Sequence, residues 1–489
     1  MTATTTSPDD VRRLIDATPT GGFLGGSWVD DGPTLTVDDP STGEPLVQVV
    51  DNPPARFLEA LTIAQDHRAA VAATSAYERS EVLRRTYELL IRDRDRLATL
   101  ITLEMGKPLA ESRAEVTYAA DFFRWFAGEA VRMDGGYRPS PAGNGRILTL
   151  QRPVGPCLLI TPWNFPIAMG ARKIAPALAA GCTSIVKPAT LTPLTMLALA
   201  ELMVEAGLPE GALSVLPSSD AGAATGPLLA DPRLRKLSFT GSTEVGVHLM
   251  GLAAEQVLRV SMELGGSAPF VVFEDADLDA AVDGAMAAKM RNGGEACTSA
   301  NRFLVHESLA AEFTDRLTTR MAALTVGRGI DDGVDLGPMI DRKAQERLRD
   351  EVADAAGAGA QVTTGGTPIE RPGWFFAPTV VADIPADHPF GREELFGPGA
   401  PIRTFADDDE AIAAANDTPY GLVAYVYTRD LDRALRTCDR LESGMVGLNR
   451  GVISDASAPF GGVKHSGVGR EGGAVGIHEY LETTYVGMA

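Results

Sequence analysis

A shortage of cysteine and of positive charge restricts what this chain can be. Among its 489 residues are four cysteines, Cys157, Cys182, Cys297 and Cys438, and none stands at the spacing of a metal site or a disulfide framework. We therefore expect no metal and a reducing cytoplasm as the location. Acidic residues outnumber basic ones by 65 to 44, leaving a formal net charge of −21. This charge repels nucleic acid and anionic membrane surfaces, so neither is expected as a partner.

Uninterrupted apolar runs are also missing. The N-terminal stretch MTATTTSPDDVRRLIDATPTGG has no apolar segment between a basic start and a cleavage site, so it does not read as a secretory signal. Four prolines break the 19 uncharged residues between Arg152 and Arg172. Because lipid cannot satisfy the backbone groups that these prolines free, we expect no membrane span.

The length and the hydrophobic pattern predict the architecture. A chain of 489 residues is expected to form two or three compact units. Apolar residues fall at helical spacing from about residue 55 to 130, which predicts long amphipathic helices. From Cys157 onward, short apolar strands alternate with helices, first from CLLIT to KLSFTG and then from APFVVF to MVGLN. The second set includes a helix expected from about Leu278 to Met290 and another at residues 309–325, and the glycine-rich APFGGVKHSGVGREGG is expected to be a loop that packs closely on another surface. This alternation predicts two α/β domains with parallel sheets, with Cys297 at the opening of the second.

Three segments place polar residues at the ends of predicted strands. FTGSTEVG, residues 239–246, opens a helix whose free amides can receive a phosphate, although an ordinary capped turn would look the same. Lys187 stands where open α/β sheets bind ligands, and a solvated surface lysine is the alternative. Asn164, in TPWNFP, can donate to a developing oxyanion or can merely satisfy the backbone of a turn.

Cys297 differs from the other cysteines in its surroundings. We expect Cys157 and Cys182, in apolar strands, to be buried as small hydrophobic residues. Cys297 lies in NGGEACTSANR, where small neighbours leave the space that a nucleophile needs for its substrate. A cysteine hydrolase would need a histidine partner, and none of the six histidines stands in a motif-like setting. Glu263, before two glycines in MELGG, would by itself be read as a solvated carboxylate.

Seven motifs together resemble the aldehyde dehydrogenase superfamily from about residue 23 to 487. They are PWNFP, KPAT, FTGSTEVG, MELGG, GEACTSANR, EELFGP and APFGGVKHSGVGREGG, in the order and approximate spacing of that family. The resemblance implies the α/β aldehyde dehydrogenase fold and a homodimer or homotetramer. It also implies three parts: a Rossmann-like cofactor-binding domain at 1–132 and 154–264, a catalytic α/β domain at 265–465, and a small oligomerisation element at 133–153 and 466–489.

The same resemblance implies a role for each motif. Cys297 matches the nucleophile that forms a thiohemiacetal with a small-molecule aldehyde, and Asn164 with the Cys297 backbone N–H matches the oxyanion hole. Glu263 matches the base that activates water to hydrolyse the thioester left after hydride transfer. The positions that match the dinucleotide site are Trp163, Lys187, Thr190, Gly241, Ser242, Leu264, Glu394 and Phe396.

Thr190 predicts the choice of cofactor. Many members that prefer NAD carry a glutamate at this position, which binds ribose hydroxyls and would repel a 2′-phosphate. Thr190 removes this repulsion while the charge of Lys187 remains. We therefore expect NADP to be accepted and preferred, with NAD possible.

Two further segments, GVISDASAPFGGVKHSGVGREGG and EMGKPLAES, look most like the succinate-semialdehyde dehydrogenases. Arg172, Arg291 and Ser454 match the positions with which that group holds the substrate carboxylate, and arginine can bind a carboxylate with two hydrogen bonds. Without the resemblance, Arg172 reads equally well as a helix-surface residue and Arg291 as a charge at a helix C-terminus. Ser299 stands where some relatives carry a second cysteine, so no local disulfide is expected.

The expected reaction is therefore oxidation of succinate semialdehyde to succinate with NADP⁺. One alternative is a dehydrogenase of another ω-carboxy aldehyde such as glutarate semialdehyde, because one carbon changes discrimination by only about 1 to 3 kcal/mol. A cysteine hydrolase or acyltransferase that never uses hydride is an alternative from another class.

Overall fold

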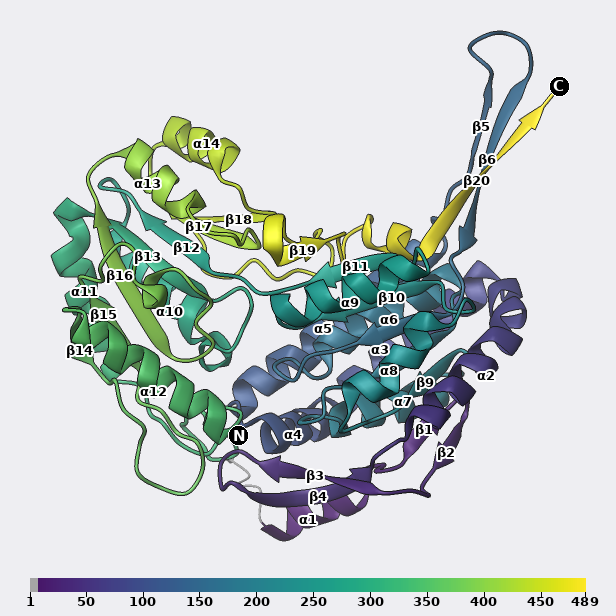
Figure 1. Cartoon of the computed structure of the whole chain (residues 1–489), viewed down its shortest axis with the longest axis horizontal. Helices are drawn as coiled ribbons and strands as arrows, with labels where there is room; N and C mark the ends of the chain where they lie inside the picture. The colour runs from purple at the N-terminus through teal and green to yellow at the C-terminus, as the bar shows by residue number, and fades with distance from the viewer. Residues whose placement is uncertain (1–7) are drawn as a thin grey trace.

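The protein consists of two α/β lobes and a projecting arm. The structure, a computed structural model, describes residues 8–489. An eight-stranded sheet forms the first lobe, a seven-stranded sheet forms the second, and a three-stranded sheet forms the arm (Figure 1). The α/β architecture with two largely parallel sheets expected from the sequence is confirmed.

The first sheet has the strand order β19-β11-β10-β7-β8-β9-β1-β2. Its central five strands are parallel: β7 (Cys157–Ile160), β8 (Ser184–Lys187), β9 (Leu213–Val215), β10 (Lys236–Thr240) and β11 (Arg259–Glu263). The edge strands β1 (Gly22–Leu24), β2 (Ser27–Val29) and β19 (Gly467–Val468) run antiparallel to their neighbours. Helices connect the parallel strands, namely α6 (Ala168–Ala180), α7 (Leu194–Glu205), α8 (Ala221–Ala230) and α9 (Thr243–Glu255).

The helical periodicity predicts long N-terminal helices, and the structure has them, packed mainly on the helices that connect the parallel strands. They are α2 (Pro54–Ala73), α3 (Ala76–Arg92), α4 (Arg94–Met105) and α5 (Leu109–Ala130), after α1 (Pro8–Asp16) and the ribbon β3 (Thr34–Asp39) and β4 (Glu44–Val50). Ser75 and Glu78 form a reciprocal capping box at the start of α3. Gly106, with φ 97°, ends α4 in the left-handed conformation. The tight turn after α4 lets α5 fold back across α3, α4 and α6.

The second sheet has the order β14-β15-β16-β13-β12-β17-β18. Its strands are β12 (Ala268–Val272), β13 (Ala300–His306), β14 (Gln361–Thr364), β15 (Thr379–Ala382), β16 (Gly399–Phe405), β17 (Val423–Tyr427) and β18 (Met445–Leu448), and only β14 is antiparallel. The helices are α10 (Leu278–Met290), α11 (Glu307–Ala322), α12 (Arg342–Gly357), α13 (Asp408–Asn416) and α14 (Leu431–Arg440). Buried aromatic side chains such as Phe270 and Phe303, with centroids 5.2 Å apart, fill its core.

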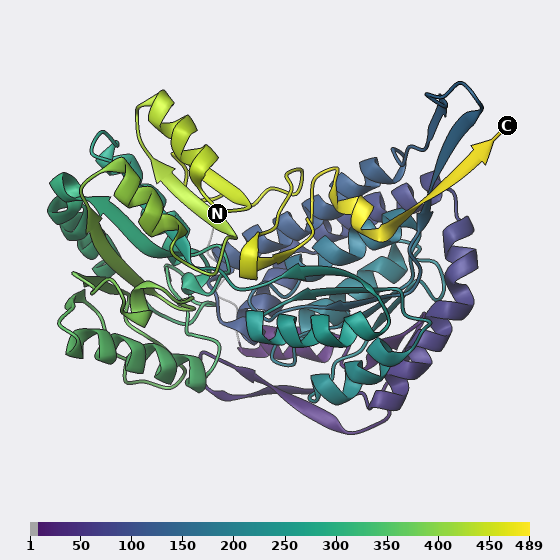
Figure 2. The same cartoon turned by 45° about the horizontal axis from the view of Figure 1, so that its top comes forward.

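The arm is formed by segments that lie far apart in the sequence. β5 (Gly136–Pro139), β6 (Arg146–Pro153) and β20 (Leu481–Met488) pair in antiparallel fashion and extend away from both lobes (Figures 1 and 2). Tyr137 and Tyr485 on the arm are each 65% exposed. Among residues 8–489 no helix has the length and apolar composition needed to cross a membrane.

The chain returns to the first lobe through the glycine-rich segment after β18. It contains the short turns η3 (Lys464–Ser466) and η4 (Gly476–Tyr480), and β19 between them pairs with β11. A Cβ at Gly467 would lie 1.8 Å from the Met262 carbonyl oxygen. Only glycine permits this approach, so the expectation that the segment packs closely on another surface is confirmed.

Candidate active site

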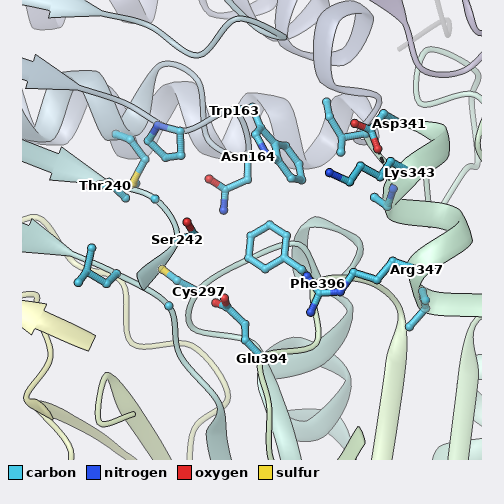
Figure 3. A pocket seen from close by; sticks show the side chains of 18 of the residues that line it. Trp163, Asn164, Thr240, Ser242, Cys297, Asp341, Lys343, Arg347, Glu394 and Phe396 are labelled. Atoms are coloured by element: carbon cyan, nitrogen blue, oxygen red, sulfur yellow. Dashed lines mark hydrogen bonds between the residues drawn. The ribbon is translucent and has the colours of Figure 1, made fainter. Parts of the chain in front are cut away.

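A cavity of about 340 Å³ lies where the two lobes meet. Three adjacent strands of the first sheet, β7, β10 and β11, end beside it, and the loop before β13 reaches it from the second lobe. Asn164 and Cys297 both line it, and Figure 3 shows their side chains pointing into the same space. Six of the predicted cofactor residues also line it: Trp163, Gly241, Ser242, Leu264, Glu394 and Phe396.

Left-handed backbone in the segment before Cys297 places the sulfur at the cavity wall. The turn η1 (Arg291–Gly294) contains Asn292 with φ 57°, Gly293 with φ 63° and Gly294 with φ 78°. A Cβ at Gly294 would lie 2.1 Å from the Gly397 carbonyl oxygen, so this position requires glycine. The Asn292 amide donates to both carboxylate oxygens of Glu111 at 3.0 Å, which fixes the turn. Cys297 itself is partly exposed.

Asn164 is held from both its side chain and its backbone. Its side-chain amide donates to the Glu295 carbonyl at 2.9 Å. Its own carbonyl accepts a hydrogen bond from Lys107 Nζ at 2.7 Å and another from Asn292 Nδ2 at 3.1 Å. Lys107 also donates to Glu115 at 2.6 Å, and both members of this ion pair are buried. The amide therefore stands in a rigid setting, as a donor to a developing charge requires.

The charge state of Cys297 depends on a balance of neighbours. Burial is the largest influence and raises the pKa of the thiol, Arg172 and Arg291 lower it, and Glu394 and Glu263 raise it, with a net pKa of about 12. The sulfur of the free protein is thus a protonated thiol at neutral pH. Because the thiolate is the nucleophile, the reaction needs an additional positive charge or a proton acceptor near the sulfur.

Glu263 ends β11 and is buried rather than solvated. It is not among the residues that line the cavity, and its Oε2 has no hydrogen-bond partner. Burial and the nearby Glu471 raise the pKa of Glu263 to about 8. A carboxyl group with a pKa in this range can release and accept a proton near neutral pH, which suits a general base.

Glu471 is a residue that the sequence interpretation missed. It accepts a hydrogen bond from Lys173 at 2.6 Å, and its Oε2 lies 2.5 Å from Arg172 Nε, with all three side chains buried. It stands in GREGG, within the segment interpreted only as a glycine-rich loop. A charged residue flanked by glycines in that loop was the available signal.

None of the three predicted carboxylate-binding residues lines the cofactor cavity. Arg172, on α6, is completely buried, and its guanidinium lies 4.1 Å from the centroid of the Phe460 ring. Neither its Nη1 nor its Nη2 has a hydrogen-bond partner. Arg291 donates to Ser454 Oγ at 3.0 Å and lies over the Phe165 ring at 5.1 Å. Arg172 is therefore not a helix-surface residue, and a second, anionic partner can still bind both of its terminal nitrogens.

Lys187 and Thr190 lie together at the end of β8, outside the cavity lining. Lys187 Nζ donates to Thr190 Oγ1 at 3.1 Å, and that hydroxyl donates to the Ser218 carbonyl at 2.9 Å. Burial lowers the pKa of Lys187 to about 8, while Asp51 opposes this shift. Within residues 8–489 this lysine makes no ion pair shorter than 4.0 Å, so its charge can bind an anionic group.

The donors and surfaces around the cavity fit a dinucleotide. Helix α9 begins beside Gly241, with the Ser242 hydroxyl accepting from the Val245 amide at its N-cap, and such helix ends bind phosphate. Trp163 and Phe396 meet edge to face at 5.4 Å on the opposite wall. The described residues contain no group of three or more His, Cys, Asp or Glu side chains placed to hold a metal ion.

Comparison with known proteins agrees with this geometry. The family model described as the aldehyde dehydrogenase family matches residues 28–486. The chain is 56% identical over 432 residues to a succinate-semialdehyde dehydrogenase of Paenarthrobacter nicotinovorans, covering 88% of this chain and 95% of that one. It is 47% identical to a glutarate-semialdehyde dehydrogenase of Pseudomonas aeruginosa, covering 95% and 96%. A solved structure of an NADP-dependent enzyme of Escherichia coli superposes with a TM-score of 0.95 at 45% identity, covering 98% and 99% of the two chains. The chain belongs to the aldehyde dehydrogenase family.

Proposed function

We propose that this enzyme oxidises succinate semialdehyde to succinate with NADP⁺. The observation that carries this proposal is the buried guanidinium of Arg172, whose two terminal nitrogens lack partners, beside the pair formed by Arg291 and Ser454. Glu471 pairs with the Nε side of this guanidinium, but the buried terminal N–H groups still lack acceptors, which is costly unless a ligand supplies them. A carboxylate bound between the two arginines provides this compensation and directs the aldehyde end of the same molecule towards Cys297.

The residues around Cys297 then perform the bond-making steps. The Cys297 thiol first loses its proton to water, and the thiolate Sγ then attacks the aldehyde carbon. The carbonyl electron pair moves onto oxygen, where the Asn164 amide and the Cys297 backbone N–H stabilise the charge. When bound, the nicotinamide supplies positive charge near the sulfur and accepts the hydride from the former aldehyde carbon. Glu263 removes a proton from the water that attacks the resulting thioester, the C–S bond breaks, and succinate leaves.

For the cofactor, we assign the two ends of the dinucleotide to separate groups of residues. Trp163, Gly241, Ser242, Leu264, Glu394 and Phe396 surround the end near Cys297. Lys187 pairs with the 2′-phosphate at the other end, where Thr190 contributes no negative charge to repel it. The similar E. coli structure is named as an NADP-dependent enzyme, which supports the same preference here.

For the assembly, we propose a homodimer or homotetramer that forms through the arm, with the enzyme located in the cytoplasm. Exposed aromatic residues on a projecting sheet, such as Tyr137 and Tyr485, are suited to an interface with another copy. The domain limits that accompany this proposal are 1–132 with 154–264, 265–465, and 133–153 with 466–489.

Steady-state kinetics of the purified protein test the proposal. We expect the highest kcat/KM for succinate semialdehyde with NADP⁺, a smaller value for glutarate semialdehyde, and the smallest for butanal. Cys297→Ala should abolish NADPH formation. If butanal equals succinate semialdehyde, the arginine pair does not select a carboxylate. If NAD⁺ is favoured by about tenfold or more, the role of Lys187 is refuted.

The same assay separates the alternatives. A preference for glutarate semialdehyde would point to the longer substrate, which the P. aeruginosa relative is named for. A cysteine hydrolase or acyltransferase would consume an acyl ester without forming NADPH from any aldehyde.

A further inference from the structure

The hydroxyl of Tyr118 is a buried polar group without an acceptor for its proton. Tyr118 lies on α5, and the neighbour that acts on its Oη is the Arg172 guanidinium, which can donate to the oxygen but cannot accept from it. Its ring packs edge to face on Phe122, with centroids 4.8 Å apart. Phenylalanine would make the same ring contact, and most buried hydroxyls in folded proteins are hydrogen-bonded, so this oxygen needs another explanation.

Tyr118 lines a second cavity, of about 590 Å³, whose lining shares no residue with that of the cofactor cavity. Ser454, which accepts the hydrogen bond from Arg291, lines the same cavity. Trp125 lies seven residues after Tyr118 on the same face of α5, and its indole N–H is likewise buried and unpaired. The cavity therefore presents uncommitted hydrogen-bond donors beside one of the arginine side chains.

The charges around this cavity favour an anion. Arg172 and Arg291 both act on the Tyr118 hydroxyl and lower its pKa, against the raising effect of burial. Of the two acidic side chains in the lining, Asp121 pairs with Arg124 at 2.9 Å, whereas Asp455 keeps its charge and accepts from the Ser457 amide and hydroxyl at 2.8 and 2.7 Å. The unpaired nitrogens of Arg172 and the hydroxyl of Tyr118 are thus left available to a ligand.

We propose that the Tyr118 hydroxyl donates a hydrogen bond to the terminal carboxylate of the substrate and so completes the clamp formed by Arg172, Arg291 and Ser454. The inference rests on the proposed function, since it assumes an ω-carboxy aldehyde. It assigns the second cavity to the acid end of the substrate. It also explains why a tyrosine occupies this position, because the substrate provides the hydrogen-bond acceptor that the protein lacks here.

The test is Tyr118→Phe, with Tyr480→Phe as a matched control. The control removes another buried hydroxyl that lacks a hydrogen-bond partner, but Tyr480 lies under Lys236 and lines neither cavity. We would measure kcat/KM for succinate semialdehyde and for butanal, and the melting temperature of each variant. In Tyr118→Phe the ratio of the two kcat/KM values should fall about ten- to a hundredfold, as expected for one hydrogen bond to a charged group. The melting temperature should change little, because the Tyr118 hydroxyl donates no hydrogen bond within the protein.

Each result decides the proposal. A ratio within about twofold of wild type in Tyr118→Phe would overturn the role of Tyr118, even if the enzyme prefers ω-carboxy aldehydes. An equal fall in the ratio in Tyr480→Phe would also overturn it, because the effect would then not be specific to the cavity. A wild-type enzyme without any preference for the carboxylate would instead refute the proposed function itself.

Discussion

Replacing Lys107 with methionine should slow catalysis without weakening cofactor binding. Lys107 Nζ donates to the Asn164 carbonyl at 2.7 Å and to Glu115 at 2.6 Å. Glu115 in turn accepts from the Ile167 and Ala168 amides at 3.1 and 3.2 Å, just after the Asn164 loop. Lys107 lines neither the cofactor cavity nor the second one. It touches no reacting atom, so we regard it as a positioning residue for Asn164.

The expected loss of kcat in Lys107→Met follows from the hydrogen bond that Lys107 donates to the Asn164 carbonyl. Loss of an oxyanion-hole donor costs about a hundred- to a thousandfold in kcat. Asn164 remains in the variant and keeps the hydrogen bond from Asn292, so we expect a smaller loss, about ten- to a hundredfold. Removing one member of a buried ion pair also costs about 3 to 5 kcal/mol, which is a large part of a typical stability of about 5 to 15 kcal/mol. Stability and positioning must therefore be separated.

The double variant Lys107→Met with Glu115→Gln makes this separation. It removes the buried unpaired carboxylate, so the melting temperature should recover relative to Lys107→Met. The Asn164 carbonyl still lacks its ammonium donor, so kcat should remain low, while the Kd of NADP⁺ stays near the wild-type value in both variants. The reasoning is refuted if kcat recovers together with stability, because Lys107 would then be only structural. A kcat within about threefold of wild type in the folded single variant would refute it as well.

Three further predictions follow from pKa values in the site. Burial holds the pKa of Lys187 at about 8, so the lysine loses its charge as the pH rises through that value. The ratio of kcat/KM with NADP⁺ to kcat/KM with NAD⁺ should therefore fall above pH 8. An unchanged ratio between pH 7 and pH 9.5, each roughly one unit or more from the pKa, would contradict this prediction. Glu263, with a pKa of about 8, accepts a proton only when ionised, so the steady-state rate should rise with pH up to about 8 while the initial burst of NADPH does not follow the same curve. If rapid-mixing experiments give burst and steady state the same pH dependence, Glu263 does not act in thioester hydrolysis. The Cys297 thiol, with a pKa of about 12, should react slowly with iodoacetamide in the free protein at neutral pH, and each unit of pH should raise the rate about tenfold. Mass spectrometry of the labelled peptide measures this rate, and a plateau below pH 9, about three units under that pKa, would contradict the burial effect.

The spacing of apolar residues in the sequence predicts helices and strands correctly where a single helical or strand period dominates the segment. The helix expected from Leu278 to Met290 is α10, with the same limits. The helix expected at residues 309–325 begins at Glu307 and ends at Ala322, because the His306 side chain caps its first turn and a bridge from Val326 to Leu336 begins soon after its end. β11 (RVSME) has only two apolar residues, Val260 and Met262, and its strand character comes from pairing with β10. Such pairing is a property of the fold and not of the five residues.

The motifs predict which residues lie together but not how each is held. The motifs predict correctly that Asn164 and Cys297 line one cavity, although 133 positions separate them in the sequence. The hydrogen bond between Lys173 and Glu471 spans 298 residues, and nothing in either local sequence indicates it. The same holds for Tyr118, because only the surrounding atoms reveal that its hydroxyl has no acceptor for its proton.

The partners of the arginine and lysine side chains explain how an acidic protein binds anions. Most arginines at the surface pair with carboxylates, as Arg433 does with three of them, and their charge is largely neutralised. Arg291 and Lys187 instead bond to hydroxyls, of Ser454 and Thr190 respectively, which orient the side chain and leave its charge uncancelled. In a chain with a net charge of −21, long-range attraction cannot bring an anion to its site. A hydroxyl partner allows a local anion site, because it fixes the position of the cationic side chain without neutralising its charge. Lys187 and Arg291 lie at the two places where the proposed reaction needs to bind an anion, the 2′-phosphate and the substrate carboxylate.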